Sequence, residues 1–174
     1  MKIQVRTLLR VAAISLALAG LVISGVVFAS DSSGRGPKFK AGLSGANEVP
    51  AVTTDTTGKA RIDFNADLTA AKFSLTVKNG VRVTQAHIHC GPAGQNGPVV
   101  VFLAGFHDRG WDVDGKWISD ASFTDANIVN TACGATLADL AQAMRDGQTY
   151  VNAHTLAHPA GEVRGQLEAG GGDD

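Results

Sequence analysis

The chain has 174 residues, and without residues 1–29 it keeps 145 residues with 12 basic and 16 acidic side chains, a net charge of −4. This mildly acidic balance, without clustered lysine or arginine in the sequence, argues against nucleic acid and against an anionic membrane as partners. A chain of this length can bury a hydrophobic core without depending on disulfides.

The N-terminal segment is typical of a secretory signal peptide. Its basic residues all lie within the first ten positions, and residues 11–28 carry no charge. Because small residues lead up to Ala29, we place cleavage after it and assign residues 1–29 to the signal peptide. The alternative is an uncleaved anchor, since the apolar stretch approaches the length of a membrane span, and only then is a membrane a partner. Either way, a secreted or periplasmic location is predicted.

A polar linker rich in glycine and serine is expected over residues 30–38, followed by a domain over residues 39–168 and a disordered tail over residues 169–174. Alternating apolar and polar side chains predict short strands in the domain. Asn79-Gly80 is a strong signal for a tight turn between two of them. The expected strands are residues 39–44, 58–65, 72–78, 81–90, 99–103, 150–154 and 161–167.

One helix is predicted over residues 136–145, where Thr136 and Asp139 form a variant of the capping box. Its apolar residues recur on one stripe, as in a helix that packs on a core. Residues 105–122 are expected to form a long excursion that exposes Trp111 and Trp117. Short strands with a single helix predict an all-β, antiparallel Greek-key β-sandwich or flattened barrel.

The two cysteines, Cys90 and Cys133, are expected to form one disulfide in an oxidising compartment, closing a loop of about 44 residues. The alternative is that Cys90 is a thiolate metal ligand beside the neighbouring histidines. With no thiol left over, nucleophilic cysteine chemistry is not expected.

The most distinctive chemistry lies in the histidines. His87 and His89 alternate on a predicted strand, so both rings point away from the core. The same parity on residues 150–154 turns His154 outward. If the two strands are neighbours, three imidazoles converge, and such a set binds copper or zinc. His158, four residues further on, is a candidate fourth ligand or a partner of the ligands.

Copper is favoured over zinc by the general affinity order of first-row metals for nitrogen ligands. The competing interpretation is that these histidines are ordinary surface residues. Other charged residues do not indicate a functional site. Glu48 and Glu162 are expected to close turns, and Arg164 is expected to form a surface ion pair with Glu162. Residues 91–98 are expected to join two strands without a binding role.

Five motifs, in order, resemble the CHRD domain, which is named for chordin and is common in exported bacterial proteins. The resemblance runs from residue 39 to residue 167 and implies an all-β exported module, in a family without one agreed activity. The motifs are Leu43-Ser44-Gly45-Ala46-Asn47-Glu48-Val49-Pro50, Ala86-His87-Ile88-His89, Gly97-Pro98-Val99-Val100, Tyr150-Val151-Asn152-Ala153-His154-Thr155 and His158-Pro159-Ala160-Gly161-Glu162-Val163-Arg164-Gly165-Gln166-Leu167.

The His-x-His strand and the later strand histidine also resemble the copper ligand pattern of Cu/Zn superoxide dismutases. The bridging histidine and the zinc cluster of those enzymes are missing, so dismutase activity is not implied and no catalytic residue is assigned. We therefore expect an exported metal-binding protein that serves in metal binding or redox buffering. The alternative is a non-catalytic extracellular module that contacts a protein partner through the Trp111 and Trp117 excursion.

Overall fold

The computed structural model describes residues 35–170, so the predicted signal peptide and the last four residues lie outside the described residues. Within residues 35–170, no helix has the length and apolar character needed to cross a membrane. The elements are β1 (Arg35–Ser44), η1 (Gly45–Asn47), β2 (Thr57–Asn65), β3 (Ala71–Cys90), β4 (Val99–Ala104), β5 (Trp111–Phe123), η2 (Asp125–Asn127), α1 (Leu137–Arg145), β6 (Thr149–Thr155), β7 (Val163–Gln166) and β8 (Glu168–Ala169).

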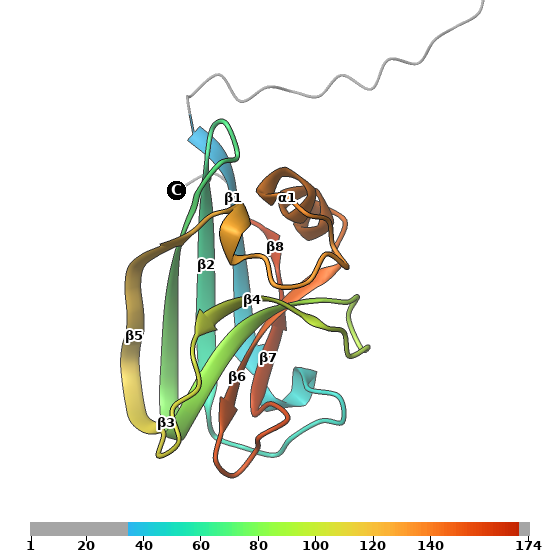
Figure 1. The fold of residues 1–174 in the computed structure, drawn as a ribbon. Coiled ribbons are helices and arrows are strands. Elements are labelled where there is room, and N and C mark those ends of the chain that lie inside the picture. The colour runs from blue at the N-terminus through green and yellow to red at the C-terminus, as the bar shows by residue number, and fades with distance from the viewer. Residues whose placement is uncertain (1–34, 171–174) are drawn as a thin grey trace, which may run out of the picture. The chain divides into compact units, whose positions relative to one another are not determined.

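The strands form one antiparallel sheet that closes on itself (Figure 1). Its order is β2-β1-β7-β6-β3, and β3 pairs again with β2, which completes the ring. Strand β4 adds to the second half of β3, and β5 adds to the first half. The predicted all-β fold with one short helix is confirmed, in its barrel-like form.

The turn predicted at Asn79-Gly80 is wrong, because β3 runs through it as one strand of 20 residues. Asn79 and Arg82 adopt φ values of 54°, and the register to β5 shifts on both sides of Gly80. Gly80 is packed between the side chains of Val77 and Val83, so the chain continues through a β-bulge. The bulge separates the half of β3 that pairs with β2 from the half of β3 that pairs with β6.

Two irregular regions are also more ordered than predicted. Strand β1 begins at Arg35, inside the predicted linker, because β2 is long enough to pair with it as far as Asn65. Strand β5 fills most of the predicted excursion, with Trp117 packed against the core and Trp111 43% exposed. Repeated register shifts hide the strand's alternation from a sequence pattern.

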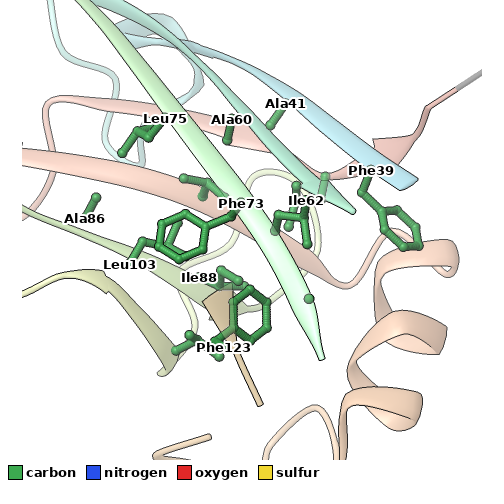
Figure 2. Close-up of a cluster of buried hydrophobic side chains, with 14 of the residues drawn as sticks. Phe39, Ala41, Ala60, Ile62, Phe73, Leu75, Ala86, Ile88, Leu103 and Phe123 are labelled. Carbon is green, nitrogen blue, oxygen red and sulfur yellow. The ribbon is translucent and has the colours of Figure 1, made fainter. Parts of the chain in front are cut away.

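The core fills the barrel and is closed at one end by α1. Figure 2 shows Ile62, Phe73 and Phe123 gathered between the strands, and the Phe73 and Phe123 rings lie 5.9 Å apart. The capping box of Thr136 with Asp139 is confirmed. All four apolar residues of the predicted stripe are buried: Leu137, Leu140, Ala141 and Met144.

The predicted disulfide between Cys90 and Cys133 is present, with the two Cα atoms 5.6 Å apart. It ties the end of β3 to the segment before α1 and rules out Cys90 as a thiolate ligand. Replacing both cysteines by alanine should lower the free energy of unfolding by about 3–4 kcal/mol, the entropic value for a loop of this size. Urea unfolding of the oxidised protein and the double variant measures the loss. A loss below about 1 kcal/mol would contradict the expectation.

Candidate metal centre

Strand pairing places three histidines on one face of the barrel wall. His87 on β3 pairs with Asn152 on β6, and His154 lies two residues further along β6. Paired residues of an antiparallel sheet point to the same face, and successive residues alternate. Ile88 therefore points into the core, while His87, His89 and His154 point out of the barrel. The predicted convergence of the three imidazoles is confirmed.

The three rings lie close enough to share one ion. His154 Nε2 is 3.0 Å from His87 Nδ1, and one nitrogen from each ring of His87, His89 and His154 lies within 4.8 Å of the others. A tetrahedral ion about 2 Å from each ligand holds its nitrogens a little over 3 Å apart. Small ring adjustments therefore suffice to reach coordination geometry.

The rings are buried, whereas the sequence placed them on an outward surface. His87, His89 and His154 are only 4%, 8% and 5% exposed. Phe102 packs edge-on against His87 at 4.8 Å, and Tyr150 stacks on His89 at 4.7 Å. The outer face of β3 and β6 around these rings is thus covered by neighbouring side chains.

Backbone carbonyls fix which ring nitrogen carries the hydrogen. His89 Nδ1 lies 2.9 Å from the Gly97 carbonyl, and His154 Nδ1 lies 3.0 Å from the Pro159 carbonyl. A carbonyl only accepts, so both Nδ1 atoms donate and both Nε2 atoms keep a lone pair. This arrangement is the usual one around histidine metal ligands. The buried Nε2 atoms of His87 and His89 have no hydrogen-bond partner among the described residues.

Asn152 adds an oxygen to the same point, and sequence reasoning missed it. Its Oδ1 is 3.0 Å from His154 Nε2. Since His154 keeps a lone pair on Nε2, two acceptors face each other, an arrangement that a cation between them would stabilise. The signal was available in the sequence, because Asn152 has the same strand parity as His154.

Burial keeps the imidazoles neutral. It lowers the pKa of His87 to about 3, with smaller contributions from His154 and His89. Burial likewise lowers the pKa values of His89 and His154, against the hydrogen bonds to the Gly97 and Pro159 carbonyls. A neutral imidazole is the form that binds metals, so the ligand set is ready at neutral pH.

The family model of the CHRD domain matches residues 39–167. The chain belongs to the CHRD domain family. Neither the curated proteins nor the solved structures compared with the chain include a match. The histidines of the candidate metal centre lie on strands β3 and β6 of this CHRD domain. Membership of this family and the disulfide are compatible with a secreted protein.

Arg164 does not form the surface ion pair predicted with Glu162. Its side chain is 1% exposed, and its guanidinium lies 3.4 Å from the centroid of the Tyr150 ring. It donates to the carbonyls of Pro92 and Gln95 and to the side chain of Asn96. Arg164 thereby holds the loop of residues 91–98, whose Gly97 carbonyl accepts from His89 of the candidate metal centre. The sequence did not indicate this role.

The predicted fourth histidine lies outside the group. His158 is in the turn between β6 and β7, where its carbonyl accepts from Thr155 and Gly161. Burial would raise the pKa of the nearby Glu162, but hydrogen bonds from threonines, led by Thr155 and Thr54, lower it. Glu162 therefore closes a turn, as predicted, and His158 belongs to that turn.

Glu48 provides a pH prediction. Burial raises its pKa to about 7, against the charge of Arg164, so the folded state holds this proton more tightly than the unfolded chain. Its contribution to stability is complete below about pH 4.5 and is lost as the pH rises through 7. Glu48→Gln should therefore lose less stability than the wild type between pH 5 and pH 8, by on the order of 1 kcal/mol. Denaturant unfolding measures this, with Glu168→Gln as the exposed control; parallel profiles would contradict it.

Proposed function

We propose that this protein is exported and that its CHRD domain binds one transition-metal ion through His87, His89 and His154, with copper preferred to zinc. The observation that carries the proposal is the meeting of three buried imidazoles, of which His87 and His89 have Nε2 atoms without a hydrogen-bond partner among the described residues. An unsatisfied polar atom in the interior is costly, and a bound cation would give such a nitrogen a partner.

The donor set fits copper. Imidazole nitrogens suit both copper and zinc, and the affinity order of divalent first-row ions favours copper. Asn152 Oδ1, 3.0 Å from His154 Nε2, would serve as a fourth donor. The three histidines line neither of two surface hollows of about 760 and 830 Å³. The burial of the three rings supports metal binding or redox buffering.

Metal analysis of the protein purified without an affinity tag tests the proposal. We expect one copper ion per chain after loading and dialysis, with zinc bound more weakly. Protein that keeps less than about a tenth of an equivalent of either metal, at unchanged fold, would contradict it.

The lowered pKa values of the three imidazoles should make the copper affinity of the proposed centre depend weakly on pH. Because burial lowers the pKa of His87 to about 3 and lowers those of His89 and His154, protons compete weakly with the metal. Copper affinity should therefore fall less between pH 7 and pH 5 than for three ordinary imidazoles, which would lose on the order of 10⁴-fold. Chelator competition at both pH values decides, and the steeper loss would show that the rings titrate normally.

A second candidate is an extracellular interaction module. Phe102, Phe106 and Trp111 are 51%, 68% and 43% exposed, and Trp111 stacks on His107 with ring centroids 4.0 Å apart. Exposed aromatic residues are good anchors for a protein partner. Protein that stays free of metal would leave this candidate standing.

A further inference from the structure

Basic side chains gather on the outer face of β1, β2 and the first half of β3. The sequence shows no such cluster, because strand pairing creates it: Lys40 lies opposite Arg61, and Lys38 and Lys72 lie on either side of Asp63, the one acidic residue among them. Residues on these strands that flank the buried positions point outward. The group holds half of the basic residues in the described chain: Lys38, Lys40, Lys59, Arg61, Lys72 and Lys78.

A groove of about 760 Å³ runs over this face, between the sheet and the loops at residues 45–49 and 93–94. Lys40 and Lys59 line it, and both are exposed and have no ion-pair partner among the described residues. Gly42 forms part of its floor, where an added Cβ would meet nothing within 4 Å. The groove is therefore open down to the backbone of β1.

The lining restricts the class of ligand. Val49 is the only apolar side chain larger than alanine in the lining of the groove. The groove therefore lacks the large apolar anchors of a protein interface and the aromatic rings on which nucleic-acid bases stack. The remaining positions are cationic or carry hydroxyl and amide groups, such as Ser74, Thr76 and Gln166. Two carboxyl groups, Glu48 and Glu168, also line it, which disfavours a ligand of uniformly high negative charge.

We propose that this groove binds a linear acidic polysaccharide. Lys40 and Lys59 face its carboxylates, and the hydroxyl and amide groups of the lining hydrogen-bond its sugar hydroxyls. Arg61, which also lines the groove, pairs with Asp63 at 3.1 Å. Lys40 on β1 and Lys59 on β2 lie on neighbouring strands, which are about 4.8 Å apart, so a linear chain that crosses the strands can bring successive charges to both. This binding is separate from the proposed metal centre, whose histidines do not line the groove.

Calorimetric titration of the full chain with a hexameric oligogalacturonate tests the charge contacts. Lys40→Glu and Lys59→Glu should each weaken binding by at least about tenfold, because a charge-assisted hydrogen bond is replaced by repulsion. Lys116→Glu, on β5 outside the groove, is the matched control and should change the affinity less than about threefold. Equal losses in all three variants would show only a general charge effect and would overturn the proposal.

A steric variant tests the place of binding without changing any charge. Gly42→Phe fills the open floor and should abolish binding, whereas Gly105→Phe, where an added Cβ also meets nothing within 4 Å, should not. Binding that survives Gly42→Phe overturns the proposal, as does equal binding of the fully methyl-esterified hexamer. Tighter binding of a thymidine hexanucleotide would also overturn it. His154→Ala should leave oligogalacturonate binding unchanged, so failure of the metal centre does not affect this result.

Discussion

His154→Ala should weaken copper binding by more than about 100-fold, since loss of even an outer partner of a metal ligand costs 10–100-fold. Removing this ring takes away the nitrogen that lies 3.0 Å from both His87 Nδ1 and Asn152 Oδ1. The remaining two imidazoles would hold the ion with no third ring. Competition titration against a chelator of known affinity measures the change, and circular dichroism verifies the fold.

The matched control is His158→Ala, which removes a histidine four residues away in the β6–β7 turn. It lies outside the group of His87, His89 and His154, so copper affinity should stay within about threefold of the wild type. If His158→Ala loses as much affinity as His154→Ala, the ligand set is wrong. If His154→Ala binds copper as the wild type does, no shared ion exists.

Arg164→Met should lower the free energy of unfolding by about 3–5 kcal/mol, the range for losing one member of a buried charged network. The change leaves the carbonyls of Pro92 and Gln95 without their donor and removes the cation from the Tyr150 ring. The loop that carries the Gly97 carbonyl, the acceptor for His89, is then held less firmly. Copper should therefore also dissociate faster from the variant.

Arg164→Lys separates charge from geometry. Lysine keeps the positive charge but lacks the planar fork that reaches several acceptors at once, so it should recover less than half of the lost stability. Arg145→Met, on the exposed surface of α1, is the control and should change stability by less than about 0.5 kcal/mol. A loss below about 1 kcal/mol for Arg164→Met would contradict the role assigned to this residue.

The sequence predicted those features that depend on local periodicity. Two-residue alternation placed His87, His89 and His154 on matching faces, and the Thr136 capping box located α1. The disulfide followed from there being only two cysteines, Cys90 and Cys133, in a chain that the sequence predicts to be exported.

Features that depend on contacts distant in sequence could not be predicted. The strong turn signal at Asn79-Gly80 became a bulge because β2, β5 and β6 all pair with a continuous β3. The histidines are buried because Phe102 and Tyr150 cover them. Arg164 is buried because it donates hydrogen bonds to the loop of residues 91–98. Each of these outcomes is decided by partners dozens of residues away.

The most direct test of the metal centre is electron paramagnetic resonance of untagged protein carrying one equivalent of Cu(II) and ¹⁵N-labelled histidine. We predict hyperfine coupling to three imidazole nitrogens, falling to two in His154→Ala. A spectrum of free copper, or one that is identical in the wild type and His154→Ala, would show that His87, His89 and His154 do not bind a common ion.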